Sequence, residues 1–399
     1  MRTDRVRLAV LMGVLAVVLL TVPAAASAAV QVANGGFETG TFSGWTEQDE
    51  PGSAGSWFVY SGTTTPLSNQ TVPAPPQGTY AAITDQEDPA ANYLYQDLHL
   101  PSGHKYLLSL YVYYTSEAPI ANPPSLDYDY TGPNQQYRVD VIKPTAMNDS
   151  VSSSDILKPV FATGATSPET MAPTLMSADL SAFAGQTVRL RAAQADNESF
   201  MHAGLDGVSI TTSPNATTGA ATRLGAHRAT LHGAVNPNSA STTYHLEYGK
   251  TKKYGARTAT HSAGAGSTTE TEAASLRGLK PGTTYHFRIV ATNAAGTTFG
   301  RDRTFSTPAS IAVSGIGTAK CTAPTTRLRV TVTSGDRTKN TSVFIGRSRV
   351  ASVASSRVSV GLSGVAPGGH SLTVRTRSAA GRTTAVRHFS VCAAAAFTG

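Results

Sequence analysis

Short runs of alternating apolar and polar residues, or of β-branched residues, recur along the chain after its first thirty positions. Gly, Pro, Asn and Ser separate these runs, and no sustained 3.6-residue apolar period occurs among them. A two-residue period with frequent turn residues is typical of β-sandwiches and barrels, so the pattern predicts an all-β fold. The predicted strands lie at residues 106–114, 137–142, 187–193, 204–211, 229–235, 243–248, 284–293, 303–307, 327–333, 342–345, 358–362, 371–376 and 384–391.

The first twenty-eight residues differ from the rest of the chain. Three arginines within residues 1–7 precede an apolar run at 8–22, which Pro23 ends. Ala26-Ser27-Ala28 then offers small residues at both specificity positions of a signal peptidase. This order predicts a secretory signal peptide at 1–28, with an uncleaved anchor as the alternative. No later stretch of 18 apolar residues follows, so we expect a secreted, extracellular or cell-surface protein with no membrane span in its mature chain.

Composition divides the remaining chain into three segments, which we predict to be domains at 29–213, 214–307 and 308–399. The first segment contains 19 acidic and 6 basic residues, the second 4 and 11, and the third 1 and 12. Both Trp and 11 of the 15 Tyr lie in the first segment. The net charge of +7 is therefore the difference between one acidic and two basic segments. It does not indicate a specific nucleic-acid partner, and we expect none.

Four motifs mark the first segment. It opens on Asn34-Gly35-Gly36-Phe37-Glu38 and Phe42-Ser43-Gly44-Trp45, and it closes on the stretches at 179–191 and 204–210. Together these motifs resemble the galactose-binding-like jelly rolls, the architecture of many carbohydrate-binding modules of secreted bacterial proteins. The resemblance implies a jelly-roll β-sandwich over 29–213 and an extracellular or cell-wall glycan as its partner.

The same resemblance implies a structural calcium ion. In such jelly rolls the opening glutamate and an aspartate of the last strand often share the ion, and the matching residues here are Glu38 and Asp206. Ca²⁺ takes about six to eight oxygen ligands, so two carboxylates brought together by pairing of the first and last strands suit it. The usual Asp-Asp pair reads Asp206-Gly207 in this chain, which removes one ligand. Alternatively, both acids are solvated residues at strand ends.

Sugar binding needs exposed aromatic faces beside carboxylate and amide groups. We expect Trp45, in the Phe-Ser-Gly-Trp turn, and Trp57, on a strand-like run, to be buried, because large aromatic residues usually pack in the core. The loop at 125–134 is a better candidate, since it alternates acids with tyrosines and is too polar for a core. Its candidate carbohydrate-binding residues are Asp127, Tyr128, Asp129 and Tyr130. Alternatively, this is an ordinary polar loop whose tyrosines cover a neighbouring sheet. Asp196-Asn197-Glu198-Ser199 is a second acidic loop with the same two interpretations.

The second segment contains the motif Leu279-Lys280-Pro281-Gly282-Thr283-Thr284-Tyr285, followed by an apolar run to Asn293. This segment resembles a fibronectin type III domain over 214–307, with Tyr285 in the tyrosine-corner position. Pro281-Gly282 predicts a turn, and we expect the Tyr285 hydroxyl to donate a hydrogen bond to upstream backbone. The resemblance implies a spacer role.

The third segment contains both cysteines of the chain, Cys321 and Cys392. Two cysteines in an exported chain should form a disulfide, and their positions near the first and last strands suggest a bridge that locks the ends of the domain; free reactive thiols are the alternative. The segment resembles bacterial Ig-like domains. Its arginines alternate along the strands, so they line one solvated face that could hold an anionic polymer. The alternative is a basic but inert surface.

Catalytic motifs are absent from the sequence: there is no His-Glu-x-x-His, Gly-x-Ser-x-Gly, P-loop or dinucleotide fingerprint. The function hypothesis is a non-catalytic carbohydrate-binding or adhesion protein, with a jelly-roll head on two β-sandwich spacers. Two alternatives stay open: a secreted polysaccharide hydrolase with its site in the first segment, and a purely structural surface protein. Spacing alone does not select a catalytic pair of carboxylates. The nominees for such a pair are Asp127, Asp129, Asp140, Asp196 and Glu198.

Overall fold

The computed structural model describes residues 30–316, 321–335 and 337–393. Within these residues the chain forms 27 strands and one turn of 3-10 helix, η1(Ser181–Phe183), so the all-β prediction is confirmed. None of the described residues belongs to a helix that is long and apolar enough to cross a membrane. The signal peptide predicted at 1–28 lies outside the described residues.

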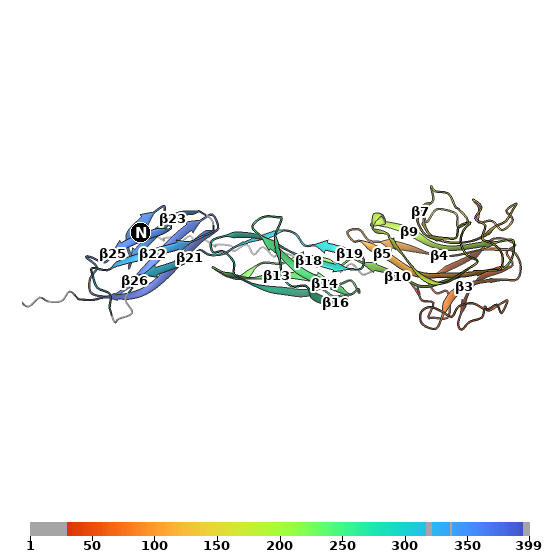
Figure 1. Cartoon of the computed structure of the whole chain (residues 1–399), viewed down its shortest axis with the longest axis horizontal. Helices are drawn as coiled ribbons and strands as arrows, with labels where there is room; N and C mark the ends of the chain where they lie inside the picture. The colour runs from red at the N-terminus through yellow and green to blue at the C-terminus, as the bar shows by residue number, and fades with distance from the viewer. Residues whose placement is uncertain (1–29, 317–320, 336, 394–399) are drawn as a thin grey trace, which may run out of the picture.

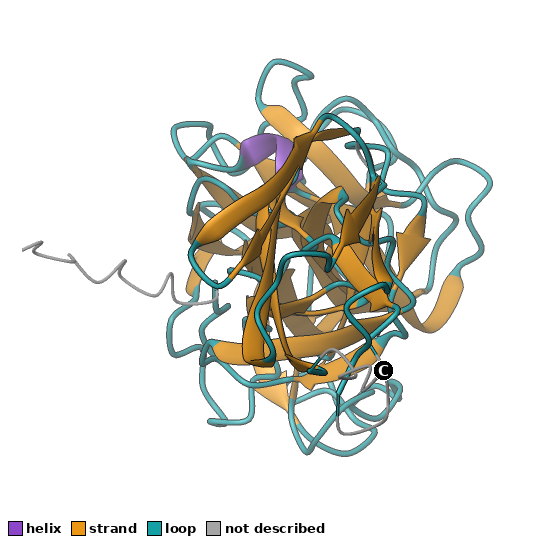
Figure 2. Ribbon diagram, turned by 90° about the vertical axis from the view of Figure 1, so that its left-hand side faces the viewer, coloured by secondary structure: helices purple, strands orange, loops and turns teal. Residues whose placement is uncertain are grey.

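Three β-sandwiches lie in a row along the long axis of the molecule (Figure 1). We name them the head (β1 to β10), the middle sandwich (β11 to β20) and the C-terminal sandwich (β21 to β27). Seen along that axis, strands fill the centre of the outline and loops project from its rim (Figure 2). Each sandwich encloses its own cluster of buried apolar side chains, so each forms around a separate core.

The head is a jelly roll of two five-stranded antiparallel sheets. One sheet has the order β1-β4-β9-β6-β7 and the other β2-β3-β10-β5-β8. The strands are β1(Thr46–Asp49), β2(Gly55–Tyr60), β3(Ala81–Gln86), β4(Ala90–Leu100), β5(Tyr106–Ser116), β6(Gln135–Ile142), β7(Ile156–Ala162), β8(Thr170–Asp179), β9(Gln186–Asp196) and β10(Met201–Thr212). Alternate residues of each strand point between the sheets, as Leu108, Leu110 and Val112 of β5 do, and this alternation builds the core.

Loops cover part of the outer face of both sheets. On the β4–β9 sheet, Leu126 packs against Tyr93, Ala193 and Ala195, which point away from the main core. On the other sheet, Val72 packs against Tyr60, Ile83 and Tyr113 in the same way. Both Trp45 and Trp57 are buried, as predicted, with 7% and 1% of their surface exposed.

The middle sandwich has β11, β13, β12 and β17 in one sheet and β15, β14, β18, β19, β16 and β20 in the other. Its strands are β11(Asn215–Thr218), β12(Thr222–Gly225), β13(Arg228–Asn236), β14(Thr242–Gly249), β15(Ala256–Arg257), β16(His261–Gly264), β17(Glu270–Arg277), β18(Thr284–Asn293), β19(Gly296–Phe299) and β20(Arg303–Ser306). The Tyr285 hydroxyl does bind upstream backbone, but as an acceptor: the Lys280 N–H donates to it over 2.9 Å. The predicted donor role is wrong because the backbone group that faces the hydroxyl is an N–H.

The C-terminal sandwich has sheets of order β21-β22-β25 and β24-β23-β26-β27. Its strands are β21(Ser310–Ser314), β22(Arg327–Thr333), β23(Thr338–Ile345), β24(Ser348–Val353), β25(Arg357–Gly361), β26(Gly368–Ser378) and β27(Gly381–Val391). The predicted disulfide is confirmed: Cys321 and Cys392 are bonded, with their Cα atoms 5.0 Å apart. Beside it, the Thr322 N–H donates to Ser390 O and the Cys392 N–H donates to Thr322 O, over 2.7 and 3.0 Å.

Side-chain amides join the head to the middle sandwich. The Asn238 amide donates to Ser213 O over 2.7 Å, and the Asn293 amide donates to Thr212 O over 2.8 Å. Both asparagines are buried, so these bonds are shielded from water. At the next junction, the Gly282 N–H donates to Pro308 O over 2.9 Å. Hydrogen bonds thus span both junctions and restrain how neighbouring sandwiches turn against each other.

Candidate functional site

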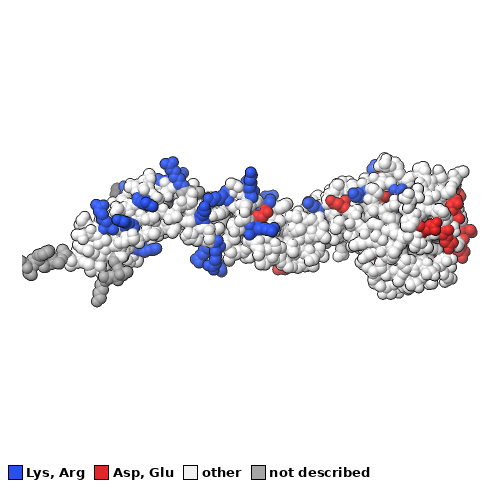
Figure 3. Space-filling model, in the orientation of Figure 1, with Lys and Arg blue, Asp and Glu red and all other residues white. Residues whose placement is uncertain are grey.

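The loop that contains Asp127, Tyr128, Asp129 and Tyr130 lies at the end of the head that faces away from the middle sandwich. We name this end the distal end and define it by three loops, at 87–89, 125–134 and 196–200. Acidic side chains gather there, whereas Lys and Arg are concentrated on the other two sandwiches (Figure 3). The sequence-based charge asymmetry between segments is therefore also an asymmetry along the molecule.

Two asparagines fix the shape of the 125–134 loop. The Asn197 amide donates to three carbonyls of the loop, those of Tyr128, Tyr130 and Gly132, over 3.0 to 3.1 Å. The Asn134 amide, which is fully buried, donates to the carbonyls of Ser125 and Asp127. Because these amides bind carbonyl groups that no strand partner could bind, they hold the 125–134 loop in one conformation. The two acidic loops predicted from the sequence are thereby joined into one surface.

The two tyrosines of this loop have different environments. Tyr128 packs against the small apolar cluster on the outer face of the sheet, and its hydroxyl donates to Pro51 O over 2.9 Å. It therefore covers the sheet, as the alternative interpretation proposed. Tyr130 is 37% exposed, which leaves much of its ring available to a ligand.

A hollow of about 210 Å³ opens beside the loop, and Asn197 belongs to both. Its lining combines carboxylates with one aromatic ring. The residues around it are Glu87, Asp88, Pro89, Asp196, Asn197, Glu198, Ser199 and Phe200. The Glu87-Asp88-Pro89 turn and Phe200 are not among the residues predicted from the sequence, although an acidic turn between two apolar runs is a visible signal.

Asp196 has the most strongly perturbed carboxylate of the hollow. Burial raises its pKa to about 7, although hydrogen bonds from neighbouring groups oppose the shift. Its oxygens accept from the N–H groups of Ala90 and Met201 over 3.1 and 3.0 Å, and also from the Gln86 amide. These bonds tie the 196–200 loop to β3 and β4. The carboxylate thus has a structural use that accounts for its burial.

Asp140, another carboxylate nominated from the sequence, lies away from the hollow. It is fully buried and bridges two arginines: Arg191, at 2.7 Å and equally buried, and Arg138. The Arg191 guanidinium also donates to the carbonyls of Asn148 and Ser150. This ion pair therefore anchors the 143–155 segment over the outer face of the sheet.

Glu38 and Asp206 lie close together in the structure. A Cβ added to Gly36 would stand 3.6 Å from Glu38 Cγ and 3.9 Å from Asp206 Oδ1. Glu38 Oε1 accepts from the N–H groups of Thr79 and Tyr80, while Asp206 Oδ2 accepts from that of Gln77 over 3.0 Å. Asp206 is fully buried, and burial together with the charge of Glu38 raises its pKa to about 6. The described residues contain no group of three or more His, Cys, Asp or Glu side chains around a common point.

The donor set at this pair fits a hard cation. Burial, and after it the charge of Glu38, raises the pKa of the Asp206 carboxyl, so its ionised form lacks a compensating positive charge, which a cation would supply. The two side chains have four oxygens, each of which already accepts at least one backbone N–H, and Ca²⁺ commonly completes such a set with backbone carbonyls and water. The alternative of two merely solvated acids does not describe Asp206, because this side chain is buried.

Three solved structures are among those similar to parts of the chain. TmCBM61, described in complex with β-1,4-galactotriose, has 15% identity and a TM-score of 0.28, and the match covers 45% of this chain and 94% of that chain. The K1 cleaved adhesin domain of Lys-gingipain from Porphyromonas gingivalis W83 has 17% identity and a TM-score of 0.25, with 44% and 94% covered. A segment of two fibronectin type III domains from chicken tenascin has 14% identity and a TM-score of 0.25, with 45% and 99% covered.

No curated protein matches the chain. Residues 230–308, which lie in the middle sandwich, match the model of the fibronectin type III domain.

Proposed function

We propose that the protein binds a carbohydrate at the distal end of the head and does not cleave it. The observation that carries this proposal is the fixed 125–134 loop, which presents an exposed tyrosine ring beside a hollow lined with carboxylates and an amide. The middle and C-terminal sandwiches then act as spacers that hold the head away from its point of attachment.

Carbohydrates need this combination of groups. The C–H face of a sugar ring packs on an aromatic face, here that of Tyr130, while its hydroxyls donate to carboxylates and exchange hydrogen bonds with amides. Asp129 and Glu198 are both exposed and face solvent at this end. Because acidic groups surround the hollow, a uronate or sulfated sugar would be repelled. We therefore propose a neutral sugar or an amino sugar as the ligand.

A glycan array with the whole chain tests this proposal. We expect binding to neutral or amino glycans, and weaker binding when both Asp129→Asn and Glu198→Gln are introduced. Incubation with the best glycan should release no new reducing ends. Cleavage that one of these substitutions abolishes would instead support the hydrolase alternative. If the chain neither binds nor cleaves any glycan, the carbohydrate proposal is wrong and a structural surface role remains.

We also propose that Glu38 and Asp206 hold a structural Ca²⁺ ion. Its chemistry would be charge neutralisation between two carboxylates, and it would link the N-terminal segment to β10 and to the residues before β3. The raised pKa of Asp206 supports this assignment, because burial and, to a smaller extent, the nearby charge of Glu38 disfavour its ionised form in the absence of a cation.

The pH dependence of head stability tests the calcium proposal. In EDTA, the folded head binds more protons than the unfolded chain between pH 3.8 and about 6, because the pKa of Asp206 is raised on folding. Stability should therefore fall as pH rises through this window, and Asp196, with its pKa of about 7, adds a change of the same sign. At pH 7.5, Ca²⁺ at 100 times its Kd should add about 2.7 kcal/mol to the unfolding free energy.

Tryptophan fluorescence measures this effect in the head alone, because both Trp of the chain lie there. Asp206→Asn should remove the response to Ca²⁺, whereas the control Asp196→Asn should retain it. If the unfolding midpoint of the head at pH 7.5 is the same in EDTA and in Ca²⁺, the calcium assignment is wrong, whereas the carbohydrate proposal is unaffected.

The disulfide and the sequence of the first 28 residues support secretion as part of this proposal. Disulfides persist in oxidising compartments, and a head that binds extracellular glycans needs to be outside the cell. Detection of the chain in the culture medium or on the cell surface, with its N-terminus at residue 29, is the expected result. A cytoplasmic chain that begins at residue 1 would contradict it.

A further inference from the structure

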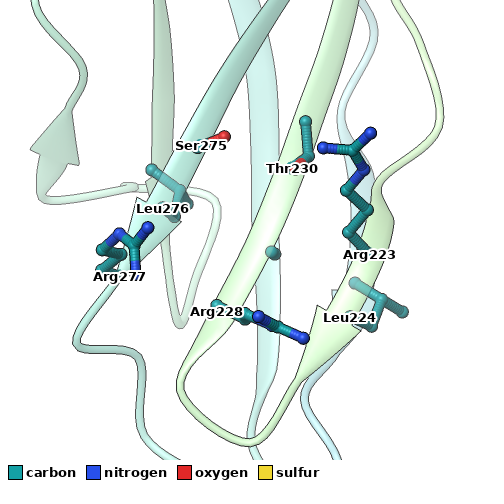
Figure 4. Close-up of a pocket in the computed structure, with 8 residues that line it drawn as sticks. Arg223, Leu224, Arg228, Thr230, Ser275, Leu276 and Arg277 are labelled. Atoms are coloured by element: carbon teal, nitrogen blue, oxygen red, sulfur yellow. The ribbon is translucent and has the colours of Figure 1, made fainter.

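Three arginines of the middle sandwich surround a hollow of about 320 Å³ on one of its sheets (Figure 4). Arg223 comes from β12, Arg228 from β13 and Arg277 from β17, so three neighbouring strands contribute one guanidinium each. We name these residues the arginine triad. The hollow is at the small end of the range of ligand pockets in proteins, and it suits one monosaccharide-sized group.

The strand register places two arginines of the triad and two hydroxyls on one face, and Arg223 lines the same hollow. Arg228 lies directly opposite Arg277, and Thr230 lies directly opposite Ser275. The intervening residues Ala229 and Leu276 point into the core and are buried. The arginines are exposed, as is Leu224, which is 44% exposed at the same hollow. The face therefore combines positive charge, hydroxyl groups and one apolar side chain.

None of the three arginines forms an ion pair among the described residues. Two acids of the middle sandwich are engaged elsewhere: Glu247 pairs with Arg288, and Asp302 with His286. The other two, Glu270 and Glu272, have the opposite parity from Arg277 along β17 and so point to the other face of the sheet. The positive charge of the triad is thus not neutralised by the acids of its own domain.

This arrangement opposes the stability of the sheet. Like charges directly opposite each other on neighbouring strands repel, and Arg228 faces Arg277 in this way. Arg223 adopts a φ of +47°, in the left-handed region that non-glycine residues rarely occupy. Like-charge pairs and strained backbone of this kind are common at functional sites, where a bound ligand compensates for their unfavourable energy.

We propose that the arginine triad binds an acidic sugar residue, one that carries a carboxylate or a sulfate, within a polysaccharide chain. Guanidinium groups bind such oxyanions through paired, charge-assisted hydrogen bonds. The hydroxyls of Thr230 and Ser275 and the side chain of Leu224 suit the remainder of a sugar ring. Lys and Arg also gather on the C-terminal sandwich, which suits a long polyanion (Figure 3). This second site is independent of the carbohydrate site proposed for the head.

Affinity measurements on the whole chain test the proposal, with immobilised heparin as the sulfated probe and polygalacturonate as the carboxylated probe. Inorganic polyphosphate serves as a polyanion without sugar. Arg223→Gln, Arg228→Gln and Arg277→Gln are combined in one variant. The control combines Arg257→Gln, Arg301→Gln and Arg303→Gln, which remove the same charge from other exposed positions of the middle sandwich. We expect the triad variant to bind at least one acidic polysaccharide at least ten-fold more weakly, and the control to change affinity less than three-fold.

Folding is monitored by the melting temperature, which should stay equal or rise in the triad variant because a like-charge pair is removed. Equal losses in both variants would overturn the proposal in favour of diffuse attraction, and so would stronger binding of polyphosphate than of either polysaccharide. A chain that binds none of the probes would also overturn it. Sedimentation velocity tests whether the triad binds a second copy of the chain. If the triad variant loses a self-association that the control variant retains, the triad binds the acidic head of a second copy and not a polysaccharide.

Discussion

Asp140→Asn is expected to lower the unfolding free energy of the head by about 3–5 kcal/mol, the largest effect of any single substitution considered for this domain. The substitution leaves the Arg191 guanidinium buried without its counter-charge, since both side chains have no exposed surface. Burial already lowers the pKa of Arg191, and the charge of Asp140 opposes that shift. The 143–155 segment should also loosen, because Arg191 holds it through the carbonyls of Asn148 and Ser150.

A matched control is available on the same sheet. Asp97→Asn breaks the ion pair with Arg189, in which the Asp97 side chain is 42% exposed, and should change the unfolding free energy by less than about 1 kcal/mol. Urea unfolding followed by tryptophan fluorescence measures both variants in the head. The double variant Asp140→Leu with Arg191→Met should recover most of the loss, because it removes both charges. A loss for Asp140→Asn no larger than that of the control would contradict this account of the ion pair.

Removal of the disulfide by Cys321→Ser with Cys392→Ser should destabilise the C-terminal sandwich by about 4 kcal/mol in the chain-entropy description. The two cysteines are 71 positions apart, so the bond restricts a long loop in the unfolded chain. It also joins the region before β22 to the end of β27, where backbone hydrogen bonds of Thr322 and Cys392 complete the connection.

In scanning calorimetry, the C-terminal sandwich of the variant should unfold at a lower temperature than that of the unsubstituted chain. Tryptophan fluorescence supplies the internal control, because both Trp lie in the head and their unfolding midpoint should not move. Chemical reduction of the disulfide in the unsubstituted chain should lower this unfolding temperature in the same way. An unchanged calorimetric profile after either treatment would contradict a stabilising role for the bond.

Strands with clear alternation could be predicted from the sequence. The run at 284–293 coincides with β18(Thr284–Asn293), and the pairing of Cys321 with Cys392 is confirmed. Among the strands of the head that were not predicted are two at sheet edges, β7(Ile156–Ala162) and β8(Thr170–Asp179). Each contains a proline, which is tolerated at a sheet edge but weakens the strand signal. The alternation of β4 is masked for another reason: residues 90–94 are buried on both faces, because a loop covers the outer one.

The candidate sites were only partly visible in the sequence. Acidic and aromatic residues identified the 125–134 loop as a candidate. Its contact with the 196–200 loop depends on three hydrogen bonds from the Asn197 amide, and no local sequence pattern predicts them. The different environments of Tyr128 and Tyr130 follow from tertiary packing. Likewise, the arginine triad depends on the register of β13 and β17, which places Arg228 opposite Arg277 across 48 intervening positions of sequence.

Calorimetric titration of the best array glycan into the whole chain shows whether the distal end of the head binds carbohydrate. Three proteins are compared: the unsubstituted chain, Tyr130→Ala, and the control Leu175→Ala, which removes a 57% exposed apolar side chain from β8. The account predicts at least ten-fold weaker binding for Tyr130→Ala, about 1.4 kcal/mol, and no change for the control. Equal affinity of all three proteins for the glycan would contradict it.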